Sequence, residues 1–289
     1  MTLDSLLASS IDGLMLGFVY GVAAMGLSLI FGVMRVVNLA HGAVMALGMF
    51  ALYLMSSQWG INPYLALIVV LGLGIALGVA MYFIAIHRVI NAPELATLLA
   101  AFAVNLIIIG LGTVAWSTSP RAVDVSLGSF QAGAVTILGT RVVAVLIASL
   151  VTAVLYLFLY RTRTGKSVRA VANNRSAAEL MGINTTGILA LSFGLGIMLA
   201  MTSGALIATL FPFTILSGDQ YQLKSFVIVV LGGLGNPTGA LLGGIILGLL
   251  EGVTTMLPFM SVGWVPVIEY AVFVGILLIR PRGLLGARI

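Results

Sequence analysis

The longest uncharged stretch of this chain runs from residue 36 to residue 86 and contains no Asp, Glu, Lys or Arg. Comparable uncharged runs cover 13–34, 95–120, 142–160, 180–218 and 225–250. Helices of water-soluble proteins need a polar face, whereas about 20 apolar residues cross a hydrocarbon core of roughly 30 Å. The sequence therefore predicts an all-α, polytopic integral membrane protein.

Composition agrees with this fold class. The chain is 61% hydrophobic and 7% charged, with a mean hydropathy of +1.22, whereas soluble domains are about one-quarter charged. Its 289 residues leave room for about eight spans and short loops, so we expect a single transmembrane domain over 1–289. The net charge of +5 comes from few, localised basic residues, which excludes a nucleic-acid partner, and cysteine chemistry is excluded because Cys is absent.

Hydropathy and turn residues divide the chain into predicted membrane segments. They lie near 10–34, 38–57, 63–87, 94–116, 140–160, 185–211, 225–257 and 264–279. The first segment lacks a positively charged leader before it, so we expect it to be retained. The linker 117–139 is expected to be an exposed loop.

Basic residues predict the orientation, because segments rich in Lys and Arg stay in the cytoplasm. Five of the 13 basic residues fall within Arg161–Arg175, and Arg280, Arg282 and Arg288 are near the C-terminus. The loop 162–184 and the C-terminus are therefore predicted to be cytoplasmic, and the N-terminus external. If each later segment crossed once, however, the C-terminal arginines would be external.

The segment 225–257 offers a solution to this conflict. Its apolar run is interrupted by glycines, an asparagine and a proline, at Gly232, Gly233, Gly235, Asn236 and Pro237. Proline and glycine disrupt helices, and irregular backbone in a membrane is tolerated only where protein or a water-filled path covers it. We predict a discontinuous or re-entrant element here, with these five residues near the translocation route at mid-depth. The alternative is a purely structural kink.

A second polar interruption is the block Asn38-Leu-Ala-His41-Gly42. Polar and ionisable side chains in membranes usually face the protein interior, so we predict that Asn38 and His41 are buried in protein and line the pathway. Alternatively, they bond exposed backbone groups at a helix start. The two interpretations are compatible.

Glycines recur every four residues at Gly13, Gly17 and Gly21, and again at Gly244, Gly248 and Gly252. This spacing puts each set on one helix face, where backbones can approach closely. Packing within the chain is the favoured interpretation, and a subunit interface is the alternative. Two late acids, Glu251 and Glu269, are interpreted as structural pairs at helix ends in preference to a proton relay.

The basic loop contains the sequence of a short capped helix. Ser176 followed by Glu179 is a capping-box pattern, and Gly182 is a natural helix stop. Ala178, Leu180 and Met181 would then fit a socket in a soluble partner; a solvated linker is the alternative. The nearby Thr164-Gly-Lys-Ser167 is not a phosphate loop, because Tyr160 stands where that motif requires glycine.

Four blocks in a fixed order carry a family resemblance. They are VYGVAAMGLSLIFGVMRVVNLAHGAVMALG, GKSVRAVANNRSAAELMGIN, VVLGGLGNPTGALLGGIILGLLEG and LLIRPRGLLG. Together they resemble the permease subunits of branched-chain amino acid ABC importers, of the LivH-like type. The resemblance implies a bacterial inner-membrane complex that contains a sister permease, two ABC ATPases and a periplasmic binding protein.

The resemblance also implies that this chain is not an enzyme and holds no cofactor or metal, since ATP and Mg²⁺ would bind the ATPases. It implies contact with the ATPase through Arg175, Ser176, Ala177, Ala178, Glu179, Leu180, Met181 and Gly182. Urea, short amides or aromatic acids remain alternative substrates. A proton-coupled transporter and a membrane-embedded enzyme are the rival function classes, and the sequence lacks a catalytic cluster for the second.

Overall fold

The computed structural model describes residues 3–132, 135–256, 263–280 and 283–286. Arg282 and Arg288, used above to orient the chain, lie outside these residues. The elements are α1 (Leu3–Met34), α2 (His41–Tyr53), η1 (Leu54–Gln58), α3 (Pro63–Met81), η2 (Tyr82–Ile86), α4 (Glu94–Trp116), β1 (Ser129–Ala132), β2 (Val135–Leu138), α5 (Gly139–Arg161), α6 (Arg163–Asn173), α7 (Arg175–Leu180), α8 (Thr185–Ala208), α9 (Ser217–Gly232), α10 (Pro237–Thr254) and α11 (Trp264–Ile279).

Six of the described helical segments are long and apolar enough to cross a membrane. They are Ser5–Met34, Pro63–Ile86, Glu94–Trp116, Gly139–Arg161, Thr185–Ala208 and Pro237–Thr254. This confirms a polytopic, helical membrane protein, although not a count of eight spans. The only strands among the described residues form a short antiparallel hairpin, β1 with β2, inside the linker that was predicted to be a loop.

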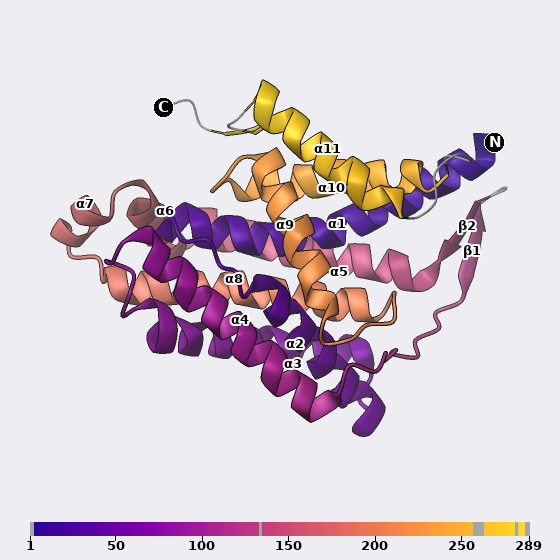
Figure 1. Ribbon diagram of the computed structural model, residues 1–289, viewed down its shortest axis with the longest axis horizontal. Helices are drawn as coiled ribbons and strands as arrows, with labels where there is room; N and C mark the ends of the chain where they lie inside the picture. The colour runs from indigo at the N-terminus through magenta and orange to yellow at the C-terminus, as the bar shows by residue number, and fades with distance from the viewer. Residues whose placement is uncertain (1–2, 133–134, 257–262, 281–282, 287–289) are drawn as a thin grey trace.

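Helix α1 is the centre of the bundle and packs against α5, α8, α9 and α10 (Figure 1). Its closest neighbour is α10, and glycines make this approach possible. A methyl group added at Gly17 would lie 2.6 Å from the carbonyl oxygen of Gly244, and one added at Gly13 would collide with the backbone of Gly248. The two glycine series therefore pack within the chain, as favoured from the sequence.

Burial differs sharply between helices of similar composition. In α8, 89% of the most apolar window is buried, but only 11% in α4. The exposed side of α4 carries large apolar side chains, among them Leu106, Ile107 and Leu111. A water-soluble protein would not expose such a surface, so this face of α4 suits lipid or another membrane subunit.

The segment 225–257 is two helices and not one interrupted span. Helices α9 and α10 run antiparallel, with Gly239 packed against Gly232 and Gly243 against Ile228. Helix α9, with 16 residues, is not one of the six candidate spans. The chain segment after α11 lies at the end of the bundle that carries α6, since Leu285 and Arg169 border the same cavity.

The break between α9 and α10 also lies at a different depth from the one predicted. Gly235 packs against Gly32, in the last turn of α1, so the break is at the α6 end of the bundle and not at its middle. The start of α2 lies deeper in the bundle than the α9–α10 break does. Arg35, in a left-handed conformation with φ 55°, ends α1, and the chain turns back to place His41 beside Ala23 of α1.

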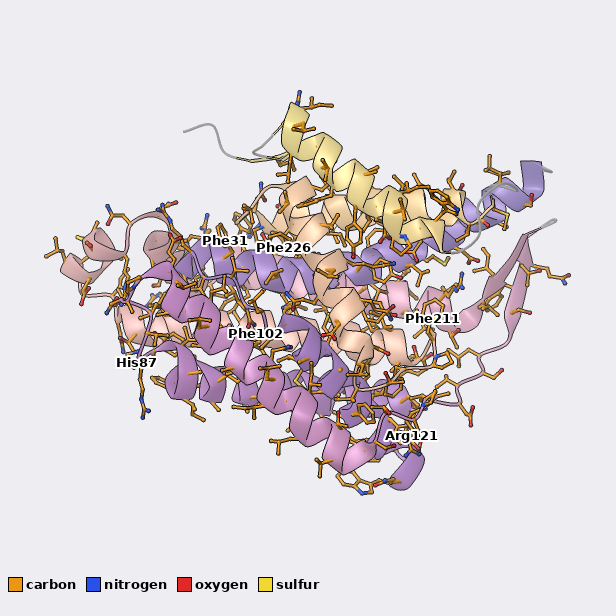
Figure 2. The ribbon with its side chains drawn as sticks, in the orientation of Figure 1. Phe31, His87, Phe102, Arg121, Phe211 and Phe226 are labelled. Carbon is orange, nitrogen blue, oxygen red and sulfur yellow. The ribbon has the colours of Figure 1, made fainter. Side chains whose placement is uncertain are left out.

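The two ends of the bundle differ in character. His87 lies at the end that carries α6 and α7, whereas Arg121 lies at the opposite end with the β hairpin and the start of α1 (Figure 2). Arg121 forms an antiparallel backbone bridge with Phe213, which fastens the linker after α4 to the loop after α8. The basic loop 162–184 and the first residues of α1 are thus on opposite sides.

Candidate functional site

The start of α2 is a buried polar junction inside the bundle. Asn38 and His41 are 1% and 0% exposed, which confirms that both face protein. The side chain of Asn38 accepts a hydrogen bond from the amide of Ala40 (3.0 Å), and its carbonyl accepts one from the amide of His41 (3.3 Å). Asn38 therefore does what the alternative interpretation required and satisfies backbone groups at a helix start.

Gln222 of α9 completes this junction. Its Oε1 accepts a hydrogen bond from the amide of Gly42 (2.6 Å), and its Nε2 donates to the carbonyl of Asn38 (3.3 Å). Gly42 and Gly218 touch through their backbones, so neither position has room for a side chain. Gln222 could not be predicted from the sequence, because its partners are about 180 residues away.

The break at 233–236 is held by Asn236. Its Oδ1 accepts hydrogen bonds from the amides of Thr238 (3.1 Å) and Gly239 (3.2 Å), and so caps α10. Its Nδ2 donates to the carbonyl of Leu285 (3.0 Å). Gly233 and Gly235 have φ values of 107° and 79°, which a glycine adopts without strain.

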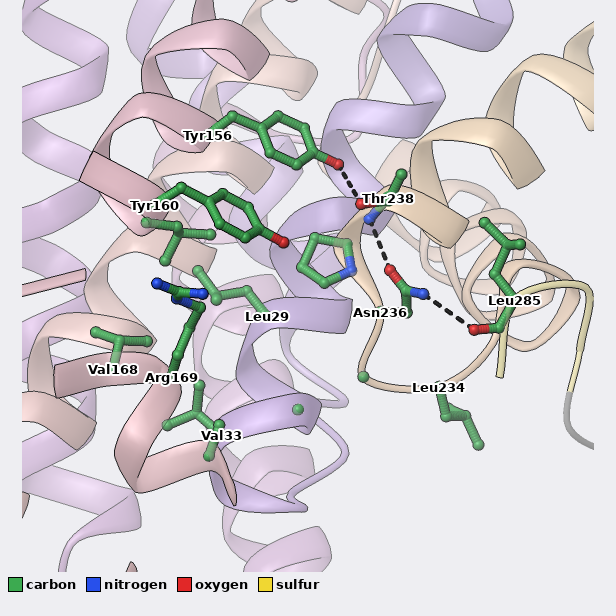
Figure 3. Close-up of a pocket in the computed structure, with 15 residues that line it drawn as sticks. Leu29, Val33, Tyr156, Tyr160, Val168, Arg169, Leu234, Asn236, Thr238 and Leu285 are labelled. Carbon is green, nitrogen blue, oxygen red and sulfur yellow. Dashed lines mark hydrogen bonds between the residues drawn. The ribbon is translucent and has the colours of Figure 1, made fainter. Parts of the chain in front are cut away.

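A cavity of about 330 Å³ separates this break from α6 (Figure 3). Tyr156 of α5 donates a hydrogen bond to Thr238 across one side (2.6 Å). The guanidinium of Arg169 on α6 lies 4.6 Å from the ring centroid of Tyr160. Of the five residues predicted at the break, Gly235, Asn236 and Pro237 thus line a cavity next to the basic loop, whereas Gly232 packs against Gly239 and Gly233 against Gly286.

The basic loop folds into two helices, α6 and α7, and the predicted cap is wrong. Asn174, in an extended conformation, accepts a hydrogen bond from the amide of Ala177 (2.9 Å) and begins α7. Ser176 is therefore inside the first turn and does not cap the helix. Asparagine caps helices as well as serine does, and Asn174 lies one turn before Ala177. Gly182 ends the turn with φ 78°, as predicted.

The surface of α7 also differs from the prediction at one position. Leu180 and Met181 are 89% and 82% exposed, but Ala178 is buried. Val168 and Val171 anchor α6 in the bundle, and Arg175 donates a hydrogen bond to Asn91 (3.2 Å). Ala177–Gly182 thus forms a projecting tip whose apolar side chains are Leu180 and Met181.

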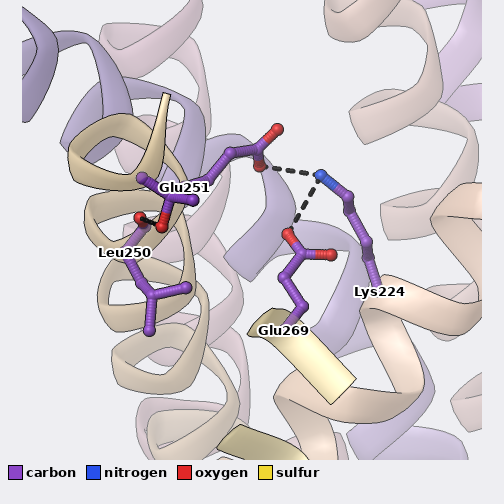
Figure 4. Close-up of polar contacts among 5 residues, drawn as sticks. Lys224, Leu250, Glu251 and Glu269 are labelled. Atoms are coloured by element: carbon purple, nitrogen blue, oxygen red, sulfur yellow. Dashed lines mark hydrogen bonds and ion pairs between the residues drawn. The ribbon is translucent and has the colours of Figure 1, made fainter. Parts of the chain in front are cut away.

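A buried ion cluster joins α9, α10 and α11 (Figure 4). The Nζ of Lys224 lies 2.7 Å from Oε2 of Glu251 and 3.2 Å from Oε1 of Glu269. The two acids are paired, as expected, through a lysine that sequence neighbours did not indicate. Glu251 is in the last turn of α10, but Glu269 lies inside α11 and not at a helix end as predicted. Among the described residues, no cluster of His, Cys, Asp and Glu could hold a metal ion.

Comparison with known proteins identifies the family. Residues 9–280 match the family model described as branched-chain amino acid transport system / permease component. The chain is 27% identical to the high-affinity branched-chain amino acid transport system permease protein LivH of Escherichia coli, covering 95% of this chain and 94% of that protein. It is 25% identical to the corresponding protein BraD of Pseudomonas aeruginosa, with 96% and 94% covered.

A more distant likeness covers less of the chain. The ribose import permease protein RbsC of Bacillus subtilis is 27% identical over 45% of this chain and 42% of its own length. No solved structure matches. Because the family model spans almost the whole bundle, from α1 to the end of α11, the chain belongs to the family of branched-chain amino acid transport system permease components.

Proposed function

We propose that this chain forms half of the translocation pathway of an ATP-binding-cassette importer in a bacterial inner membrane. A sister permease supplies the other half, two ABC ATPases supply the energy, and a periplasmic binding protein delivers the substrate. The observation that carries the proposal is the family match over residues 9–280, which covers both the membrane bundle and the loop 162–184. The substrates that fit best are branched-chain amino acids, which the names of its relatives specify.

The ATPase acts on this chain through the tip Ala177–Gly182. Leu180 and Met181 enter an apolar socket of the ATPase, while Arg175, Ser176 and Glu179 surround them. Helix α6 carries the movement into the bundle, because its buried valines pack there. ATP and Mg²⁺ bind to the partner, and this chain binds no cofactor of its own.

The positive-inside tendency orients the complex. It places the loop 162–184 and the C-terminus in the cytoplasm, and the first residues of α1 outside. The contact of Leu285 with Asn236, beside α6, supports a common side for the loop and the C-terminal segment.

Substrate passes the polar junction of Asn38, His41 and Gly42 and leaves near the break Gly232–Pro237. Irregular backbone deep in a bundle, as at the start of α2, is tolerated where it lines a path. The proximity of the break to α6 supports a gate that the ATPase operates at the cytoplasmic end.

Reconstitution of the complete importer in proteoliposomes tests this function. We expect ATP-dependent uptake of leucine, isoleucine and valine when the binding protein is added outside. Urea, acetamide and benzoate, offered in the same way, report the alternative substrate classes. Uptake driven by a pH gradient with this chain alone, without ATP, would instead show a proton-coupled secondary transporter.

A further inference from the structure

A cavity of about 310 Å³ opens beside the ion cluster, between α1, α9, α10 and the loop after α8. This volume is at the lower end of small-molecule sites, which run from roughly 300 to 1,000 Å³. Its wall combines aromatic and apolar side chains with one ion pair, and includes Tyr20, Phe211, Pro212, Tyr221, Lys224 and Glu251. Phe211 is located toward the end of the molecule that carries the β hairpin (Figure 2).

The ion pair on this wall presents opposite charges side by side. Lys224 and Glu251 are 2.7 Å apart, and their side chains are only 16% and 21% exposed. Charged groups within membrane segments are costly and usually mark a functional site. An α-amino acid carries the same two charges on adjacent groups, so its carboxylate could replace Glu251 at Lys224 while its ammonium pairs with Glu251.

Glu269 keeps Lys224 paired during such an exchange. It lies behind Lys224, 3.2 Å from Nζ, with a side chain 3% exposed, and it does not border the cavity. Leaving a buried charge without a partner is strongly unfavourable. Because Glu269 continues to hold Lys224, Glu251 can turn to a ligand without leaving the lysine unpaired.

The aromatic wall suits the rest of such a ligand. The rings of Tyr20 and Tyr221 are 6.1 Å apart between centroids, and the Nζ of Lys224 lies 4.9 Å from the Tyr20 centroid. Aromatic faces attract cations and also bury aliphatic groups. An aliphatic amino acid would therefore meet both an ion pair and apolar surface in the same cavity.

We infer that this cavity is a binding subsite for the zwitterionic head group of an aliphatic α-amino acid, with Glu251 receiving its ammonium and Lys224 its carboxylate. This inference rests on the proposed function and selects amino acids over urea and amides. A neutral solute cannot open the Lys224–Glu251 pair, because it would return no charge to either partner.

Equilibrium binding of radiolabelled leucine tests the subsite in nanodiscs that contain both permeases and both ATPases but no binding protein. Competition by 4-methylpentanoate, which lacks the ammonium, and by leucinamide, which lacks the carboxylate, should be weaker than that of leucine by about tenfold or more. This series uses the unmodified protein, so folding of a variant does not affect it. Equal competition by either analogue would overturn the inference.

The variant Glu251→Gln should weaken leucine binding by about tenfold or more, because the amide cannot neutralise an ammonium group. Asp219→Asn is the matched control, since Asp219 is an exposed acid of α9 outside the cavity wall, and it should bind leucine like the wild type. Wild-type affinity in Glu251→Gln would contradict the subsite.

ATP-driven uptake by the complete importer, measured in parallel, separates the two claims. Uptake of leucine together with unselective or absent binding in nanodiscs would overturn the subsite alone. Uptake of urea or an amide but not of leucine would overturn it too and leave the importer in place. If no solute is taken up with ATP, the proposed function fails and this inference fails with it.

Discussion

Gln222 and Gly42, on helices α9 and α2, are joined by a 2.6 Å hydrogen bond from the Gly42 amide to the Gln222 side chain. The same side chain donates to the carbonyl of Asn38. The Gln222 side chain therefore bonds two backbone groups at the start of α2, the Gly42 amide and the Asn38 carbonyl. This contact ties α9 to the start of α2.

The variant Gln222→Leu should disturb α2 and abolish uptake. It leaves the Gly42 amide without its partner, at a cost of about 1–3 kcal/mol if water cannot reach it, and the Asn38 carbonyl keeps only the bond from the His41 amide. We expect a lower melting temperature in detergent and loss of ATP-driven uptake. Gln58→Leu, at an exposed position, serves as the control, and equal behaviour of the two variants would contradict the role of Gln222.

The variant Gly17→Leu should destabilise the α1–α10 pair. The added side chain would meet the backbone of Gly244 and Ile245, and overpacking of this kind costs about 1–3 kcal/mol. Thermal unfolding of the purified chain in detergent measures the effect. Gly72→Leu is the control, because nothing lies within 4 Å of a methyl group there; a similar loss in both would argue against the packing.

The variant Asn236→Ala should impair transport more than it impairs stability. Loss of the helix cap costs about 1 kcal/mol, and the bond to Leu285 that holds the C-terminal segment is also lost. Asn184→Ala removes a comparable cap from α8 and should cost similar stability. Uptake rates at matched protein levels compare them, and equal rates would show that the break has no part in gating.

Much of the bundle follows from sequence because its signals are local. The glycine series predict close helix packing, and Gly17 against Gly244 confirms it. Burial of Asn38 and His41 follows from the cost of polar groups in lipid, and the structure confirms it. The position of the α9–α10 break is also where glycine and proline predict it.

Tertiary contacts account for what the sequence did not predict. Lys224 meets Glu251 and Glu269 only because α9, α10 and α11 pack together. Lys224 and Glu251 are 27 residues apart in the sequence, too far for a local pattern to predict their contact. The depth of the break depends on the α9–α10 hairpin. In the sequence the hairpin appears as one apolar segment, 225–257, so its two helices could not be told apart. Ser176 and Asn174 are both good capping residues, and the backbone conformation at Asn174 decides between them.

The burial of Ala178 changes the expected effect of substitutions in α7. A bulky residue at position 178 would disrupt packing within the loop itself. Loss of uptake in such a variant would therefore not identify a surface that contacts a partner. Met181→Asp is the sharper change, because Met181 is 82% exposed. We expect it to insert normally and lose ATP-driven uptake, since a charge cannot enter an apolar socket without a partner. Thr164→Asp, exposed on α6, should retain uptake.

Site-specific cross-linking tests the central claim, engagement of an ABC ATPase through α7, most directly. The chain contains no cysteine, so Met181→Cys and Ser119→Cys each provide one reactive site, at opposite ends of the bundle. In membranes that contain the assembled importer, a short thiol-to-amine cross-linker should join Met181→Cys to the ATPase and leave Ser119→Cys unlinked. An ATPase that co-purifies with the permease but cross-links only to Ser119→Cys, or to neither site, would contradict the account.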